Sequence, residues 1–185
     1  MPTTLDNLGV YAGILFEWID QADNGVVSFR DRGHVVLNQR MESGSADLEG
    51  NQIWHSRPGE YRRLSAGGSV TFDLTALTLE MLGYTASLDP FVEIRSVLVI
   101  NRTSVQGSYL LVGAAASNEW HEPFGAAGDT VRCAAGSQLM LSSLVDGWPV
   151  SGSSKNLKIA NPSAVDVDYE ICILGTTAAS TSSSA

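Results

Sequence analysis

The stretch Val165-Asp-Val-Asp-Tyr-Glu-Ile-Cys-Ile-Leu174 decides the fold class of this chain. Every second residue from the first valine to the last isoleucine is apolar, and the carboxylates Asp166, Asp168 and Glu170 occupy the positions between them. Successive side chains of a β-strand point to opposite faces, so this alternation places one apolar face on a core and one acidic face toward water or a partner. The pattern predicts a half-buried β-strand.

Similar short runs, each followed by a turn rich in Gly, Asn, Ser or Pro, recur from residue 69 onward. They lie at residues 69–75, 91–100, 108–113, 130–133, 138–142 and 156–160. In the first run the alternation places Val70, Phe72 and Leu74 inward. About eight strands at this spacing predict an all-β fold, a jelly-roll-like β-sandwich over residues 61–175. Residues 75–84 are expected to form one helical turn that ends at Gly83.

Residues 1–60 have a different pattern and are interpreted as an N-terminal extension. Residues 26–30 and 34–38 flank Asp31-Arg-Gly33, a typical short hairpin connection. Residues 43–58 are expected to form a long loop or an arm that packs on a neighbour, because loops of this length are usually functional or disordered. Residues 176–185 form a small, polar C-terminal tail with nothing to bury, and we expect it to be disordered by itself.

Composition excludes some functions. The chain has 185 residues and a net charge of -9, with no local cluster of basic residues, so we expect no direct binding of nucleic acid. The first residues lack the pattern of a signal peptide, and no run is apolar enough to span a membrane. We therefore expect a soluble protein that is made in the cytoplasm. Two cysteines, Cys133 and Cys172, are too few for a disulfide framework and are interpreted as free, buried thiols.

The sequence contains no recognisable catalytic or metal-binding motif. His34, His55 and His121 lie far apart, and no pair of ligands has metal-binding spacing. There is no nucleophile elbow and no phosphate-binding glycine loop. The acidic row near residue 168 could attract a cation, but a solvated strand face is the preferred interpretation. We expect no cofactor, no metal and no enzymatic activity.

Aromatic residues outside the strand pattern are the candidate partner-binding residues. Trp120 and Phe124 lie in a predicted loop, and Trp54 lies in the predicted long loop of the N-terminal extension. Such rings either plug the open end of a sandwich or anchor a partner, and both interpretations stay open. Phe16 and Trp18, in an apolar stretch of the extension, complete the candidate set.

The sequence from residue 69 to residue 175 resembles the small β-sandwich structural proteins of tailed-bacteriophage virions. The segments that carry the resemblance are Val70-Thr-Phe-Asp-Leu-Thr-Ala-Leu77, Ile94-Arg-Ser-Val-Leu-Val-Ile-Asn101, Leu110-Leu-Val-Gly113, Asn156-Leu-Lys-Ile-Ala-Asn161 and Tyr169-Glu-Ile-Cys-Ile-Leu-Gly175. They cover a little over half of the chain and contain strand and turn patterns. The resemblance implies a protein that decorates or cements a capsid, or sits at a head or tail joint.

Such a protein is expected to be a homo-oligomer whose partners are the major capsid protein or other virion proteins, and to be located in the virion after assembly in the host cytoplasm. A cement protein clamps a shell through many modest symmetric contacts. The N-terminal segment and the tail are the expected intersubunit elements. The alternative is a host-recognition or carbohydrate-binding module that uses loop aromatics, and a third interpretation is a cupin-type enzyme with a metal inside its barrel.

Overall fold

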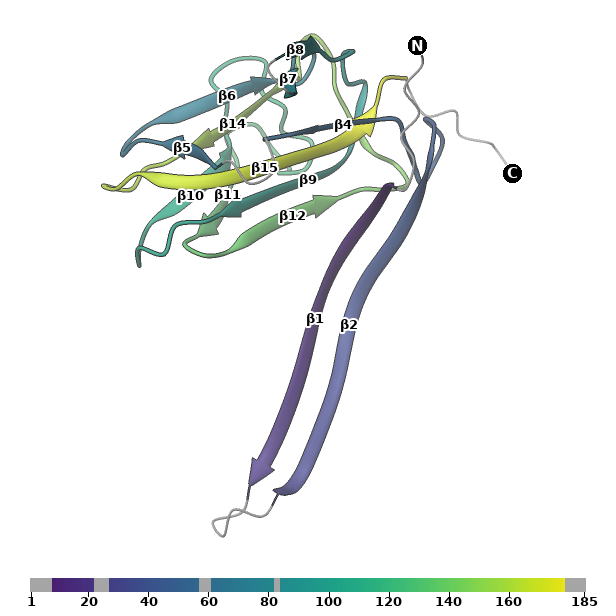
Figure 1. Ribbon diagram of the computed structural model, residues 1–185. Coiled ribbons are helices and arrows are strands. Elements are labelled where there is room, and N and C mark those ends of the chain that lie inside the picture. The colour runs from purple at the N-terminus through teal and green to yellow at the C-terminus, as the bar shows by residue number, and fades with distance from the viewer. Residues whose placement is uncertain (1–7, 22–26, 57–60, 82–83, 179–185) are drawn as a thin grey trace.

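The computed structural model describes residues 8–21, 27–56, 61–81 and 84–178, and for the strand residues 8–9, 12–21, 27–38, 80–81 and 84 it describes the backbone. The regular secondary structure in these ranges consists of β-strands (Figure 1). This confirms the all-β prediction. The finer expectation of jelly-roll connectivity stays a prediction.

The larger sheet has six strands and contains the stretch that decided the fold class. Its strands in spatial order are β12 (Gln138–Ser142), β9 (Glu93–Asn101), β15 (Val167–Thr176) and β4 (Gln52–His55), while β13 (Trp148–Pro149) pairs with β9 and β5 (Arg62–Leu64) pairs with β15. All of these pairs are antiparallel. The apolar run at residues 91–100 thus becomes the central strand β9, with neighbours on both sides.

The second sheet has four strands and faces the first. Its order is β11 (Thr130–Ala134), β10 (Tyr109–Gly113), β14 (Asn156–Ala160) and β6 (Ser69–Asp73). Phe72 and Leu157 from this sheet share one buried core with Val99 and Ile171 from the six-stranded sheet. The two sheets therefore form a sandwich. The inward positions predicted for Phe72 and Leu74 are confirmed, since the two side chains are 6 % and 0 % exposed.

A long hairpin projects from one end of the sandwich (Figure 1). It consists of β1 (Leu8–Gln21) and β2 (Val27–Ser43), which pair antiparallel from Leu8 opposite Met41 to Gln21 opposite Val27. We call this hairpin the arm. At a rise of about 3.3 Å per residue, the fourteen residues of β1 span about 46 Å.

The structure corrects three predictions. The expected turn at Asp31-Arg-Gly33 lies inside β2, where Gly33 pairs with Phe16, because the ladder to β1 satisfies the backbone along the whole strand and outweighs a local turn preference. The long loop expected at residues 43–58 is replaced over residues 43–56 by β3 (Glu49–Gly50), which runs parallel to the end of β2, and by the sheet strand β4, while residues 57–58 lie outside the described residues. The helical turn expected at residues 75–84 is replaced by β7 (Thr78–Met81), which pairs with β8 (Tyr84–Ser87), while Gly83 lies outside the described residues.

Candidate interaction surface

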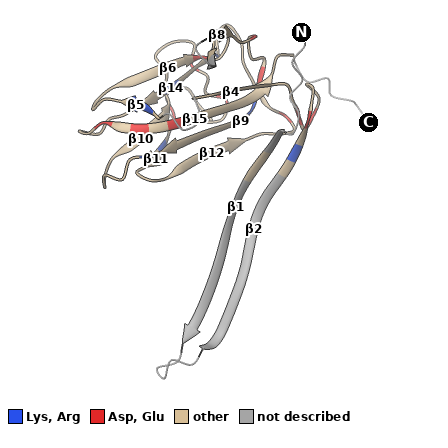
Figure 2. Cartoon of the chain, in the orientation of Figure 1, with Lys and Arg blue, Asp and Glu red and all other residues tan. Residues whose placement is uncertain are grey.

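The outer face of the six-stranded sheet changes from polar to apolar along β15. Inward positions such as Tyr169 and Ile171 are buried in the core, as the alternation predicted. The outward positions are Asp168, Glu170, Cys172 and Leu174, in that order toward the end of the sheet from which the arm projects (Figures 1 and 2). The first two are charged and the last two are not. This face therefore has a polar end and an apolar end.

The polar end consists of ion pairs at the surface. Arg63 Nε donates to Asp168 Oδ1 at 2.7 Å, and Arg102 Nε donates to Glu170 Oε1 at 2.7 Å. The hydrogen bond and the charge of Arg63 lower the pKa of Asp168 below its usual value, despite a smaller opposing effect of burial. In the described part of the chain, no three His, Cys, Asp or Glu side chains are grouped so that they could hold a metal ion.

The apolar end is built from one register row that crosses four strands. Cys172 lies opposite His55 on one side and Leu98 on the other, and Leu98 in turn lies opposite Met140. Above this row is a hollow of about 250 Å³, whose lining residues are His55, Ser56, Leu98, Ile100, Glu170, Ile171 and Cys172. Burial raises the pKa of the Cys172 thiol to about 11, so the thiol is uncharged near neutral pH.

A second hollow, of about 260 Å³, lies where the base of the arm meets the same sheet. It is lined by Val10 and Tyr11 of the arm and, among others, by Leu98, Met140 and Cys172 of the sheet. The two hollows share Leu98 and Cys172. We call these two neighbouring hollows together the groove.

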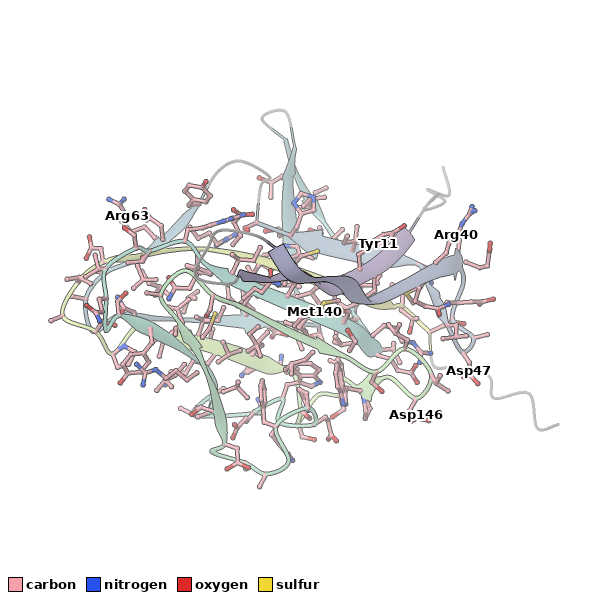
Figure 3. The ribbon with its side chains drawn as sticks, turned by 90° about the horizontal axis from the view of Figure 1, so that it is seen from below. Tyr11, Arg40, Asp47, Arg63, Met140 and Asp146 are labelled. Atoms are coloured by element: carbon pink, nitrogen blue, oxygen red, sulfur yellow. The ribbon has the colours of Figure 1, made fainter. Side chains whose placement is uncertain are left out.

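The base of the arm covers one end of this apolar face. Val10 of β1 and Met41 of β2 are 4 % and 2 % exposed, and they form a small buried cluster with Leu174. Ile53, Met140 and Leu144 pack against this cluster. Tyr11, which lines the second hollow, is 67 % exposed, and Arg40 is also exposed; both are labelled in Figure 3. The foot of the arm is thus buried at Val10 and Met41 and exposed at Tyr11 and Arg40.

A buried arginine fixes the chain at the foot of the arm. The side chain of Arg95 has no exposed surface, and its Nη2 lies 3.1 Å from Glu93 Oε2. Its Nη1 donates hydrogen bonds to the carbonyl oxygens of Leu144, at 3.4 Å, and Val145, while Nη2 donates to those of Ser45, at 3.5 Å, and Ala46, at 3.4 Å. Arg95 therefore ties the segment that follows β2 to the segment that follows β12.

The structure places the candidate aromatic residues in two different settings. Trp54 and Trp120 are 2 % and 0 % exposed, and both belong to the sandwich core. Trp120 Nε1 donates to the carbonyl oxygen of Pro149 at 3.1 Å, and its ring meets Phe124 edge to face at 6.3 Å. Phe124 is partly buried and packs against the core. The rings of Trp54, Trp120 and Phe124 therefore fill the core of the sandwich, as the plug interpretation predicted, and do not form a partner anchor.

Trp54 and Trp120 are therefore withdrawn as partner-binding candidates, because a fully buried ring offers no surface. For Phe16 and Trp18 the structure describes the backbone, which lies in β1 opposite Gly33 and Asp31, and their side chains are outside the described part. Sequence reasoning missed the groove residues Leu98 and Cys172. The available signal was that both lie in segments that are apolar at consecutive positions, Val97-Leu-Val-Ile100 and Ile171-Cys-Ile-Leu174.

Comparisons with known proteins assign no family. No protein-family model matches the chain, and a search of curated proteins gives no significant match. Both described cysteines are free thiols; Cys133 is buried, as predicted, whereas Cys172 is only partly buried. Within the described ranges no helix has the length and apolar character needed to cross a membrane.

Proposed function

We propose that this protein is a non-enzymatic structural subunit of a bacteriophage virion, most simply a decoration or cement protein that stabilises the capsid through protein contacts. The observation that carries the proposal is the arm, which leaves the sandwich as a two-stranded ribbon (Figure 1). Its partners in this role are the major capsid protein or other virion proteins and further copies of the chain.

The physical argument starts from the marginal stability of an isolated ribbon. A two-stranded hairpin alone in water is marginal at best, and its two outer edges present unpaired backbone groups. The span of about 46 Å along β1 exceeds the span of about 30 Å along the nine residues of β9, the central strand of the sandwich. An element of this length that reaches beyond its own domain gains stability when another subunit covers it. Arms of this kind suit a protein that joins subunits.

The anchoring at the foot of the arm supports the same function. The four carbonyl oxygens that Arg95 contacts lie in two segments that are far apart in sequence, so the foot of the arm is fixed to the body of the sandwich. Because the foot of the arm is fixed, a force that acts on the arm is transmitted to the sandwich. That property suits a clamp between neighbouring subunits of a shell.

The assignment to a virion rests on the resemblance of residues 69–175 to phage β-sandwich structural proteins. The net charge of -9 is compatible with a position on the outside of a particle, where the protein would have no attraction for packaged nucleic acid. The alternative of a carbohydrate-binding module depended on exposed loop aromatics. Because the Trp120 ring is buried, no observation now favours that alternative.

The test uses particles of the phage whose genome encodes this chain. Purified particles are analysed for the chain by mass spectrometry, and particles produced with and without it are heated while the release of DNA is followed with a fluorescent dye. We expect the chain to be a stoichiometric particle component and its omission to lower the temperature of DNA release. Particles that lack the chain, or that release DNA at the same temperature without it, would overturn the proposal.

A further inference from the structure

One edge of the six-stranded sheet is formed by β12, which pairs with β9 and with no other strand in the described part of the chain. The hydrogen bonds at its two ends show which backbone groups this pairing uses. At one end, Asn101 N donates to Ser137 O at 2.9 Å. At the other end, Ser143 N donates to Arg95 O at 3.0 Å. Because hydrogen-bonded residues alternate along an antiparallel ladder, the odd-numbered residues of β12 bond to β9 and the even-numbered residues turn their backbone groups outward.

The outward backbone groups belong to Gln138, Met140 and Ser142. Among the residues that the structure describes, none makes a hydrogen bond to the backbone N–H or C=O of these three. Each of them therefore presents one donor and one acceptor along the same side of an extended strand. Such a row is a template for pairing with another strand.

The sequence of β12 lacks the features that usually protect an exposed sheet edge. Residues 137–145, Ser-Gln-Leu-Met-Leu-Ser-Ser-Leu-Val, contain no charged residue, no proline and no glycine. On β11, the edge strand of the other sheet, the exposed Arg132 occupies an outward position. Charged side chains on an edge discourage pairing with a further strand. Of these two neighbouring edges, β12 is therefore the one that is open to a partner.

The outward groups of β12 are symmetric about Met140. When two copies of β12 lie antiparallel with Met140 opposite Met140, Gln138 of each copy lies opposite Ser142 of the other. These are the residues with free backbone groups, so each outward N–H meets an outward C=O. None of the facing side chains is charged. A second copy of the same strand thus satisfies the whole edge.

The charges near the two ends of β12 have opposite signs. Arg132 lies near its start, because the thiol of the next residue, Cys133, donates to Ser137 O at 3.5 Å. Asp146 is exposed in the turn that follows its end (Figure 3). An antiparallel arrangement brings the start of one β12 to the end of the other, so Arg132 of each copy is placed on the side of Asp146 of the other. This complementarity favours a second copy in the antiparallel orientation.

We propose that two copies of this chain join through β12 as an antiparallel, two-fold symmetric pair, so that their six-stranded sheets form one continuous sheet. The partner is a second copy because one strand supplies both complementary edges and because the charges at its ends match. The contact is isologous and closes with two copies. It rests on the proposed role of the chain as an assembly subunit, and it names the surface through which two copies meet.

Cysteine cross-linking tests this pairing in the full-length chain. All variants carry Cys172→Ser, which removes the partly buried thiol, while the buried Cys133 stays. Residues directly opposite in a hydrogen-bonded antiparallel pair have Cα atoms about 5.5 Å apart, within the range of about 4.4–6.8 Å that a disulfide spans. Met140→Cys should therefore form a covalent dimer on air oxidation. Thr130→Cys, at an exposed outward position of β11, is the matched control and should give no covalent dimer.

The register is tested by mixing two further variants. Gln138→Cys and Ser142→Cys should each give little covalent dimer alone, because each of these positions faces the other one across the pair. An equimolar mixture should give a disulfide-linked dimer that contains one chain of each variant. Mass spectrometry identifies this mixed species.

Sedimentation over a range of concentrations measures the association without a cross-link. Met140→Lys places two like charges opposite each other and should weaken the dimer by about tenfold, whereas Thr130→Lys should form the same dimer as the wild type. Because Met140 also packs against the cluster at the foot of the arm, circular dichroism checks the fold. If Met140→Lys does not fold, Gln138→Pro replaces it. This change removes one outward N–H at an exposed position and leaves the pairing with β9 intact.

Three results would overturn the inference. If the wild type is monomeric at all concentrations, the β12 edge does not join two copies. If the wild type associates but Met140→Cys gives no more covalent dimer than Thr130→Cys, the copies meet through another surface. If the mixture of Gln138→Cys and Ser142→Cys gives no mixed dimer, the register is wrong. None of these results bears on the presence of the protein in purified particles, so failure of the pairing inference and failure of the proposed function are distinguishable.

Discussion

Gly147 lies against the guanidinium group of Arg95. A Cβ atom built on this glycine would be 3.1 Å from Arg95 Nη1 and 3.2 Å from Glu93 Oε2, and the backbone φ of Gly147 is +69°. This position thus combines a left-handed backbone conformation with close contact to the buried ion pair at the foot of the arm.

Substitution Gly147→Ala is expected to destabilise the protein for both reasons. The left-handed conformation alone costs a residue with a Cβ about 1–2 kcal/mol, and the contact with Arg95 adds to this cost. Chemical denaturation measures the free energy of unfolding. The matched control is Gly136→Ala, because Gly136 has a similar φ of +66° and no atom within 4 Å of a built Cβ. Equal losses in the two variants would show that the packing against Arg95 does not matter.

Substitution Arg95→Met should remove the link between the foot of the arm and the sandwich. It deletes the hydrogen bonds to the carbonyl oxygens of Ser45 and Ala46 and takes one partner from the Glu93 carboxylate, which is 12 % exposed. Loss of one member of a buried ion pair typically costs about 3–5 kcal/mol of stability. Hydrogen exchange should also become faster at residues 44–48.

The control for this variant is Arg63→Met, which breaks the exposed ion pair with Asp168, where the two side chains are 65 % and 32 % exposed. Because water screens exposed charges, this change should leave the free energy of unfolding almost unchanged. If Arg95→Met were as mild as Arg63→Met, the anchoring role of Arg95 would be wrong.

Substitution Trp120→Ala tests the interpretation of the loop aromatics as plugs. The ring is fully buried and contacts Trp148 at 6.1 Å, so truncation leaves a cavity and a lost hydrogen bond to Pro149. We expect a loss of about 3–5 kcal/mol in the free energy of unfolding. Tyr61→Ala, at a residue that is 55 % exposed, is the control and should have a small effect. An unchanged stability for Trp120→Ala would contradict the plug interpretation.

The pH dependence of stability should include a contribution from Asp73. Burial raises the pKa of this carboxyl, but hydrogen bonds from Lys155 and Thr75 and the charge of Lys155 together lower it more, so its pKa in the folded state is below the usual value. A depressed pKa adds stability above the unfolded-state pKa of about 3.9, and this stability is lost as the pH falls through the folded-state pKa.

Asp73→Asn should therefore be less stable than the wild type near about pH 6, and the difference should shrink as the pH falls below about 4. Urea denaturation at several pH values measures this difference. Asp89→Asn, at an exposed carboxylate, serves as the control. A difference that does not change with pH would mean that the ion pair of Lys155 and Asp73, 2.5 Å apart, does not contribute through its charge.

The sandwich strands were predictable because their signal is local. In β15 the alternation that places Tyr169 and Ile171 inward and Asp168 outward is visible in ten consecutive residues, and the structure has the same pattern. The arm was not predictable, because Asp31-Arg-Gly33 resembles a hairpin turn and only the pairing of Gly33 with Phe16, seventeen positions earlier, makes it part of one strand. Hydrogen-bonded pairing between two separate segments produces no recognisable pattern in the sequence of either segment.

The sequence by itself determined the fold class, the inward and outward faces of the core strands and the absence of recognised catalytic motifs, since these depend on residue types at fixed spacing. The tertiary structure decided where those strands meet. It brought Leu98, Cys172 and Met140 into one row of the groove, buried Trp54 and Trp120, and set Arg95 beneath the foot of the arm. The physical reason is that strand alternation acts over two residues, whereas sheet register and sandwich packing join residues that can be a hundred positions apart.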